Sequence, residues 1–353
     1  MVSGKNTVVL EDVIMQKGLK VRAGSKILEG FVSPFTATVD QKLSGKYEIT
    51  GRVETNEFCI GGYYDSSEEE KNFCAIDAVK SGSAEFALCN DIFGNYRRFS
   101  PKAGCCYIHP TYGTVSRLGL VPITQSMDSI GVLCKNIADG LTLLAQIAGN
   151  DPKDGAMFPE ISYDYAASAG KIRIGIPQNV FASAEKTTSD AANSLAAEFE
   201  KTNIKLEYFD VYSQVMSILT SAEICNNISR YDGIKYGYRA EDFRGVEDLY
   251  VKTRTQGLGA DAKLAAILGC LVLSQDFYDR YYNKAMKIRR LIKDSLRFDS
   301  YDLIVLPCCV AGELAALAGL PACSFLYKGA GIQLIANVRQ EHLFKNVQEV
   351  LPA

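Results

Sequence analysis

Residues 109–131 read HPTYGTVSRLGLVPITQSMDSIG. This segment has neither the apolar spacing of a helix nor the strict alternation of a half-buried strand. Gly, Pro, Ser, Thr and Tyr are frequent in it, yet Val, Leu and Ile recur throughout, so we expect it to be partly buried. A long, irregular, half-buried loop of this kind suits the floor of a binding or active site, and a purely structural connection is the alternative.

Apolar segments on both sides of this loop predict an α/β fold. β-branched and apolar residues cluster in six expected strands, at residues 7–10, 47–50, 171–176, 204–209, 302–306 and 331–337. A 3.6-residue apolar period predicts helices at residues 136–149, 188–201, 211–228, 261–297 and 341–350. Strands that alternate with helices predict one mixed, largely parallel, twisted sheet covered by helices on both faces. We expect a single domain over residues 1–353, with a polar linker at residues 150–165.

The composition is that of an ordinary soluble globular chain with a large core. Of 353 residues, 47% are hydrophobic and 22% are charged, and the formal net charge is −3. A weakly acidic chain lacks the basic surface expected for binding nucleic acid or an anionic membrane. The basic segment at residues 284–297 is expected to be a solvated helix face. The polar N-terminus and the absence of a long apolar run predict a cytoplasmic protein.

The eleven cysteines and two histidines do not have the spacing of a metal site. No Cys-x-x-Cys motif occurs, and several cysteines lie within apolar segments. We therefore interpret the cysteines as small buried hydrophobic residues in a reducing compartment. The sequence predicts no bound metal and no cofactor.

Several segments resemble the amidase-signature family, and most closely the A subunits of the glutamine-dependent aminoacyl-tRNA amidotransferases. The resemblance is strongest in the loop at residues 109–131, which we call the opening loop, and around the helix after it. The matching residues are 110–113 (PTYG), 119–121 (GLV) and 148–154 (AGNDPKD). Further ordered matches occur at residues 49–52, 56–58, 229–233, 236–242, 257–290, 301–307 and 317–322. This resemblance implies an α/β fold with one mixed sheet wrapped by helices. The N-terminal helices of the family are expected to be absent from this chain.

The resemblance also implies where the family's catalytic residues would fall. In that family a serine attacks the amide, a second serine relays its proton and a lysine acts as the base. A serine hydroxyl needs a nearby proton acceptor, and burial can lower the pKa of a lysine enough to provide one. Carried along the matching segments, the lysine position falls on Glu11, the relay position on Lys71 and the nucleophile position on Asn95.

None of these three replacements can perform the family's chemistry. The Asn95 amide is not a nucleophile at neutral pH, and Glu11 has no hydroxyl at the other two positions from which to accept a proton. Phe93 and Tyr96 are expected to crowd the place where backbone N–H groups would approach an oxyanion. Because an unpaired buried carboxylate is costly, we expect Glu11 and Lys71 to lie within salt-bridge reach.

The substrate-binding positions also differ from the family pattern. The arginine expected to hold a glutamine carboxylate falls on Leu264 or Ala265, and Glu313 is the candidate for the acidic partner of the substrate amine. The matching segments supply six candidate residues for the lining of the remaining pocket: Asp91, Gly94, Arg97, Tyr112, Ser126 and Asp128.

Three hypotheses for the function follow. The first is an amidase-fold pseudoenzyme that acts as a non-catalytic interaction or regulatory subunit, with a catalytic A-type or a B-type amidotransferase chain as partner and a homo-oligomer as a further option. The second is an active hydrolase that uses Cys89, Cys105 or Cys106, with His109 as its base, since His342 is expected on a helix surface. The third is a small-molecule-binding sensor.

Overall fold

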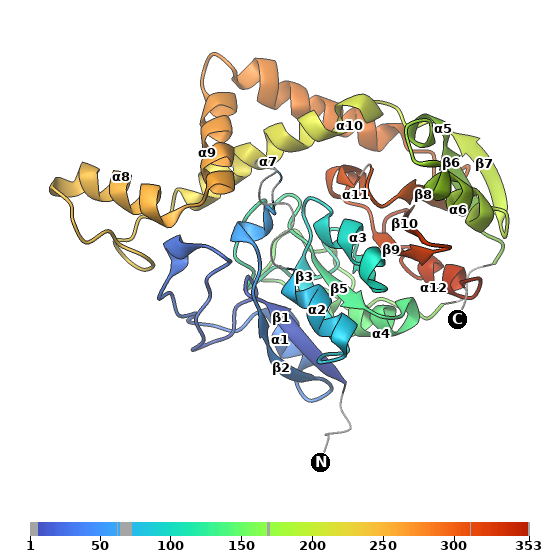
Figure 1. Cartoon of the computed structure of the whole chain (residues 1–353), viewed down its shortest axis with the longest axis horizontal. Helices are drawn as coiled ribbons and strands as arrows, with labels where there is room; N and C mark the ends of the chain where they lie inside the picture. The colour runs from blue at the N-terminus through green and yellow to red at the C-terminus, as the bar shows by residue number, and fades with distance from the viewer. Residues whose placement is uncertain (1–5, 62, 64–72, 168–169, 311, 352–353) are drawn as a thin grey trace.

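One mixed sheet of ten strands runs through the part of the chain that the structure describes (Figure 1). The computed structural model describes residues 6–61, 63, 73–167, 170–310 and 312–351. Neighbouring strands follow the order β2-β1-β3-β5-β4-β9-β10-β8-β6-β7. Their bounds are β1 Thr7–Glu11, β2 Glu48–Val53, β3 Phe86–Asn90, β4 Cys106–His109, β5 Ile130–Cys134, β6 Arg173–Pro177, β7 Glu200–Ile204, β8 Leu303–Pro307, β9 Ala322–Tyr327 and β10 Ala330–Ala336.

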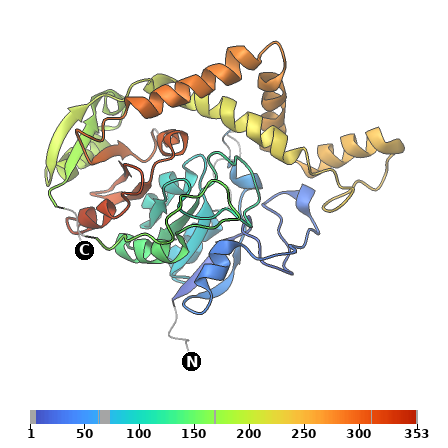
Figure 2. The same ribbon diagram turned by 180° about the vertical axis from the view of Figure 1, so that it is seen from behind.

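Helices surround this sheet, and some of them extend away from it (Figure 1). The helix bounds are α1 Thr38–Leu43, α2 Cys74–Ser81, α3 Asn95–Phe99, α4 Ile137–Ile147, α5 Gln178–Phe181, α6 Lys186–Ala196, α7 Tyr212–Ile228, α8 Gly245–Gly257, α9 Ala260–Leu273, α10 Lys284–Ser295, α11 Glu313–Ala318 and α12 Leu343–Gln348. Helices α7 and α10 run along the top of the molecule in Figure 1, and α8 projects furthest from the sheet. Figure 2 shows the same projection from behind.

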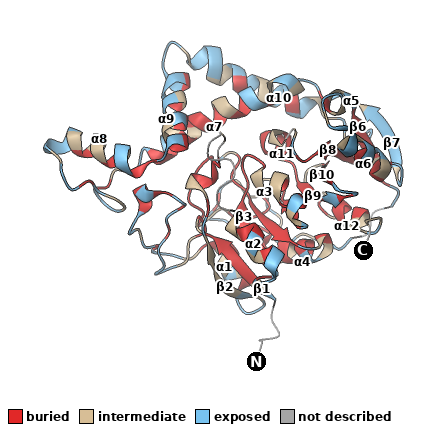
Figure 3. Ribbon diagram, in the orientation of Figure 1, coloured by how far each residue is buried: buried red, intermediate tan, exposed pale blue. Residues whose placement is uncertain are grey.

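The core lies along the middle of the sheet. Every residue of β3, β4, β5 and β8 is buried, whereas β7 at one edge is almost wholly exposed. Figure 3 shows this contrast, with buried central strands and exposed outer faces on α8, α9 and α10. The sequence pattern did not reveal β3, β4, β5 and β9, each of which includes a cysteine that interrupts the run of β-branched residues.

The mixed sheet is confirmed, but its pairing is not largely parallel. Parallel pairs join β2, β1 and β3 at one end and β8, β6 and β7 at the other. The five central pairs, from β3 through β5, β4, β9 and β10 to β8, are antiparallel. The expected strand at residues 204–209 is wrong, because β7 ends at Ile204 and a turn follows. The missed strands account for the antiparallel centre.

The single long helix expected at residues 261–297 is also wrong. Helix α9 ends at Leu273, a turn follows at Ser274, and a π-helical segment at Tyr278–Asn283 leads into α10. The Ser274 hydroxyl donates to the backbone carbonyl of Leu271 at 2.7 Å. A serine side chain that satisfies a local carbonyl competes with the helical backbone ladder, which favours the break at this position.

The opening loop is held in place by the segment after α4. The backbone N–H of Phe158 donates to the carbonyl of Gly113 at 2.9 Å, and Arg117 forms an ion pair with Asp154. The expected linker at residues 150–165 therefore packs against the opening loop and does not run through open solvent. Strands from both sides of this segment enter one sheet. The single-domain organisation stays a prediction.

Helices α7 and α9 pack so closely that a glycine is required between them. A Cβ placed at Gly269 on α9 would collide with the backbone oxygen of Ser221 and the Cβ of Cys225 on α7. We expect Gly269→Ala to lower the free energy of unfolding by about 1–2 kcal/mol, although Ala is the better helix former. Urea denaturation measures the change. Gly51→Ala is the control, because no atom lies within 4 Å of the added Cβ. Equal stability of the two variants would contradict the packing argument.

Candidate functional site

Glu11 ends strand β1 with its carboxyl group fully buried. The Tyr96 hydroxyl donates to Oε1 at 2.7 Å, and the backbone N–H of Asn90 donates to Oε2 at 2.8 Å. The Cys59 thiol lies 3.7 Å from Oε2. Burial raises the pKa of Glu11, and hydrogen bonds from Tyr96, Thr55, Asn90 and Cys59 counteract part of that rise. Both oxygens of this carboxyl group therefore accept hydrogen bonds from neutral groups of the protein.

The expected ion pair between Glu11 and Lys71 stays a prediction, because Lys71 lies outside the described residues. The other two positions taken from the resemblance do come together. Asn95 begins helix α3, and its neighbour Tyr96 contacts Glu11 directly. The end of β1 and the start of α3 therefore share one site.

A cavity of about 250 Å³ opens beside Asn95, and we call it the Asn95 cavity. It is lined by Gly61, Tyr63, Phe93, Gly94, Asn95, Arg98, Cys308, Cys309, Gly312 and Glu313. The Asn95 amide donates to the carbonyl of Gly61 at 3.4 Å. The rings of Tyr63 and Phe93 stack with their centroids 4.1 Å apart. Phe93 borders this cavity as expected, whereas the Tyr96 side chain is directed toward Glu11.

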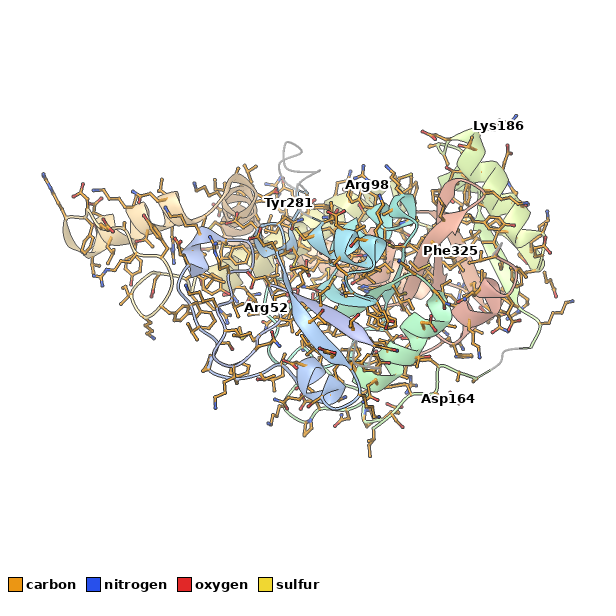
Figure 4. The ribbon with its side chains drawn as sticks, turned by 60° about the horizontal axis from the view of Figure 1, so that its bottom comes forward. Arg52, Arg98, Asp164, Lys186, Tyr281 and Phe325 are labelled. Atoms are coloured by element: carbon orange, nitrogen blue, oxygen red, sulfur yellow. The ribbon has the colours of Figure 1, made fainter. Side chains whose placement is uncertain are left out.

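Asp91 and Arg97 form a buried ion pair behind this cavity. The Arg97 Nε lies 2.9 Å from the Asp91 Oδ2, and the two side chains are 0% and 1% exposed. Asp91 also accepts the backbone N–H of Tyr96 at 3.1 Å, while Arg97 donates to the carbonyl of Gly312 at 2.8 Å. These bonds fix the start of α3 against the segment before α11. Arg98, the next residue of α3, lines the Asn95 cavity and is labelled in Figure 4.

Asp128 anchors the opening loop to strand β3. Its Oδ1 accepts the side-chain amide of Asn90 at 3.0 Å, and its Oδ2 accepts the backbone N–H groups of Ile123 and Thr124 at 3.0 and 3.1 Å. Burial raises the pKa of Asp128 to about 6 in spite of these hydrogen bonds. The carboxyl group thus binds an amide and the loop backbone, and it serves to organise the loop.

Tyr112 and Ser126 lie on a different cavity of about 350 Å³, the Ser126 cavity. The Ser126 hydroxyl donates to Glu223 at 2.5 Å and accepts from the Arg289 Nη1 at 3.0 Å. Arg290 and Lys293 also line this cavity. Glu223 and Arg289 were not expected from the sequence. The only signal for Arg289 was the basic segment at residues 284–297.

The six expected lining residues therefore do not border one pocket. Gly94 lines the Asn95 cavity, Tyr112 and Ser126 line the Ser126 cavity, and Asp128 lines a third of about 420 Å³ beside Arg117. Asp91 and Arg97 are buried. The opening loop separates these cavities, because its polar side chains bond to its own backbone and to neighbouring elements.

The three cysteines considered as nucleophiles are poorly placed for that role. Cys89 and Cys105 are buried in the apolar cluster around Tyr107. Burial raises the pKa of each thiol, in the case of Cys106 to about 12. Cys106 and His109 stand three residues apart on β4, so their side chains point to opposite faces of the sheet. Burial also lowers the pKa of His109.

The substrate positions taken from the resemblance are separated as well. Leu264 is exposed on α9, and Ala265 is buried in the core. Glu313 does line the Asn95 cavity, together with the exposed thiol of Cys309. Cys309 was not singled out as a candidate from the sequence, although it lies only four residues before Glu313.

Within the described ranges, no group of three or more His, Cys, Asp or Glu side chains is arranged to hold a metal ion. In the same ranges, no helix combines the length and the apolar character needed to cross a membrane.

Comparison with known proteins identifies the family. The family model described as Amidase matches residues 77–322. The chain belongs to the amidase family. It is 36% identical over 332 residues to the A subunit of the glutamyl-tRNA(Gln) amidotransferase of Lachnoclostridium phytofermentans, a match that covers 85% of this chain and 66% of that relative. The corresponding chain of Neisseria gonorrhoeae is 35% identical over 327 residues, with 85% and 68% covered. This amidase-family chain thus spans about two thirds of the length of those relatives.

Solved structures show the same fold. The A subunit of the glutamyl-tRNA(Gln) amidotransferase of Thermotoga maritima is 23% identical, with a TM-score of 0.71 over 97% of this chain and 83% of that one. The native peptide amidase of Stenotrophomonas maltophilia is 20% identical, with a TM-score of 0.74 over 97% and 81%. The expected amidase-signature α/β fold, with its mixed sheet, is confirmed.

The buried carboxyl group of Glu11 allows a test by pH. Its folded-state pKa lies above the ordinary 4.5, so the folded protein binds the proton more tightly than the unfolded chain. The stability that this proton provides is present below pH 4.5 and is lost as the pH rises through the folded-state pKa. Relative to Glu11→Gln, the wild type should therefore lose stability with rising pH, by at most about 1.4 kcal/mol per pH unit.

Urea denaturation from about pH 5 to about pH 8 measures this difference. In the Glu11→Gln variant, the Gln side-chain oxygen can still accept the hydrogen bond from the backbone N–H of Asn90. The Gln side-chain amide can donate a hydrogen bond to the Tyr96 hydroxyl. Glu85→Gln, at an exposed glutamate, is the matched control and should follow the wild-type profile. Parallel profiles for the wild type and Glu11→Gln would contradict a raised Glu11 pKa.

Proposed function

We propose that this amidase-family protein is a non-catalytic relative of the glutamyl-tRNA(Gln) amidotransferase A subunits and acts as an interaction or regulatory subunit. The observation that carries the proposal is the burial and hydrogen bonding of Glu11. At the position of the family's base, this carboxyl group is buried and accepts hydrogen bonds from Tyr96 and Asn90. A carboxyl group that is fully buried and hydrogen-bonded to the fold is not open to a substrate-side proton.

The Asn95 position supports the same proposal. An amide nitrogen conjugated with its carbonyl is not a nucleophile, and here it donates to the carbonyl of Gly61. The cavity beside it holds only about 250 Å³, and the stacked rings of Tyr63 and Phe93 form part of its wall. This space is small for a substrate and for the water that would hydrolyse an acyl intermediate.

An exposed apolar surface supports the role in interaction. Leu264, Ile267 and Leu271 are 44%, 68% and 45% exposed, and they follow one another at helical spacing on α9. Val246 and Val251 on the projecting helix α8 are 61% and 64% exposed. Large exposed apolar side chains on neighbouring helices are typical of a protein interface. Because the relatives are named as subunits, the proposed partner is another amidotransferase chain, of the A or B type, in the cytoplasm.

One observation favours a second candidate, an active hydrolase. The thiol of Cys309 is exposed and lines the Asn95 cavity together with Arg98 and Glu313. A thiol needs a neighbouring base or cation to attack a carbonyl carbon, and Arg98 is such a cation. The small-molecule sensor is the third candidate, and the cavity of about 420 Å³ between Met15, Phe35 and Arg117 is where its ligand would bind.

Hydrolysis assays distinguish the first two candidates. We expect the purified protein to release ammonia from glutamine or simple carboxamides at least about 1,000-fold more slowly than an active A-type chain measured in parallel, because the nucleophile is missing. Asn95→Ser should not restore activity, since no base is available to that hydroxyl. Turnover that Cys309→Ala abolishes and Cys106→Ala leaves intact would instead establish the hydrolase.

Co-purification tests the proposed interaction. The tagged chain at native expression level should retain an amidotransferase A-type or B-type chain, identified by mass spectrometry. Ile267→Asp should reduce recovery of that chain at least about tenfold, because it places a charge in the apolar surface. Ile161→Asp is the matched control, since Ile161 is 86% exposed outside that surface. Equal recovery with both variants would exclude the α9 surface, and recovery of no amidotransferase chain would contradict the proposed partner.

A further inference from the structure

Two thiols on different helices lie in contact at the junction of α7 and α9. The Sγ atoms of Cys225 and Cys270 are 3.4 Å apart. Cys225 belongs to the last turn of α7, and Cys270 lies near the end of α9. Both thiols are free. No motif in the sequence indicated this pair, because the two residues are 45 positions apart.

The helix backbones are close enough for the two thiols to join. Gly269, the residue before Cys270, lies so near α7 that an added Cβ would collide with the Cys225 Cβ and with the backbone oxygen of Ser221. No side chain at that position holds the helices apart. Bringing two sulfur atoms from 3.4 Å to the bond length of about 2.05 Å therefore requires changes in side-chain torsion angles and little backbone movement.

The exposure of the pair sets it apart from the buried thiols of the core. Cys270 is exposed and Cys225 is half-buried, so a small solute can reach the pair. Seven cysteines are buried: Cys59, Cys89, Cys105, Cys106, Cys134, Cys308 and Cys323. Thiol oxidation follows accessibility, which directs an oxidant to the α7–α9 junction before the core.

We propose that Cys225 and Cys270 are a redox modification site, at which a hydroperoxide converts the two thiols into a reversible disulfide between α7 and α9. In the first step the exposed Cys270 sulfur attacks the peroxide O–O bond. Cys270–SH and ROOH then give Cys270–SOH and ROH. In the second step the Cys225 sulfur attacks the Cys270 sulfur, the S–O bond breaks, and the products are the disulfide and one water. The two thiols together give two electrons, and the peroxide accepts them.

The surroundings fit this order of events. Burial and the neighbouring Cys270 thiol raise the pKa of Cys225 to about 11, and the Arg254 guanidinium opposes part of that rise. Cys225 is less exposed than Cys270, so a solute reaches Cys270 first, and the Cys225 sulfur lies 3.4 Å from the sulfur whose sulfenic acid it would resolve. Closing the disulfide fixes the helix that carries Leu264, Ile267 and Leu271 to the last turn of α7.

Peptide mapping tests the proposal on the full chain. Trypsin cleavage after Lys205, Arg230, Lys263 and Arg280 isolates Cys225 in residues 206–230 and Cys270 in residues 264–280. After treatment of the native protein with about one equivalent of hydrogen peroxide, these two peptides should appear as one linked species, which a dithiol reductant separates again. No disulfide should join two chains, and the thermal midpoint of the linked chain should rise by about 4 °C.

Single variants provide the controls. Cys225→Ser and Cys270→Ser should each remove the linked species and the rise in the thermal midpoint. Cys309→Ser changes another exposed cysteine and should leave both results intact. The proposal is overturned if peroxide instead converts Cys270 to its sulfinic acid, if it links two chains through Cys270, or if the linked peptides form only in denaturant.

Discussion

Asn90 joins three parts of the molecule that are distant in sequence. Its backbone N–H donates to Glu11 on β1, its side-chain amide donates to Asp128 in the opening loop, and its side-chain oxygen accepts the backbone N–H of Ser129. All of these groups are buried. Because a buried polar group without a partner costs up to several kcal/mol, the end of β1, the end of β3 and the loop must keep this one arrangement.

This arrangement places two buried carboxyl groups in hydrogen bonds with the fold. Glu11 and Asp128 have raised pKa values through burial, which in other proteins is a sign of acid–base catalysis. Here each one accepts hydrogen bonds from the fold itself. A buried acid held in this way stabilises loops, and it releases its proton only at a cost in desolvation.

The helices beyond the sheet have a different character. Helices α8, α9 and α10 present exposed faces, and α9 combines exposed apolar side chains with a glycine contact to α7. That contact is a close backbone approach, which a side chain at position 269 would prevent. The features proposed for interaction and for oxidation both lie on this helix, well away from the polar centre around Asn90.

The sequence by itself determined the α/β class and located five of the ten strands in the described residues. Its resemblance to the amidase-signature family also led us to expect that two serines and a lysine are replaced at the catalytic positions. Those conclusions depend on residue identity and on local periodicity, which a linear pattern contains. Tertiary structure decided the antiparallel centre, because β3, β4, β5 and β9 have no clear strand pattern and their pairing joins segments that are distant in sequence. It also decided that Gly94, Tyr112 and Asp128 border separate cavities and that Cys225 meets Cys270. Contacts between residues many positions apart follow from the packing of whole elements, and neither composition nor spacing along the chain specifies that packing.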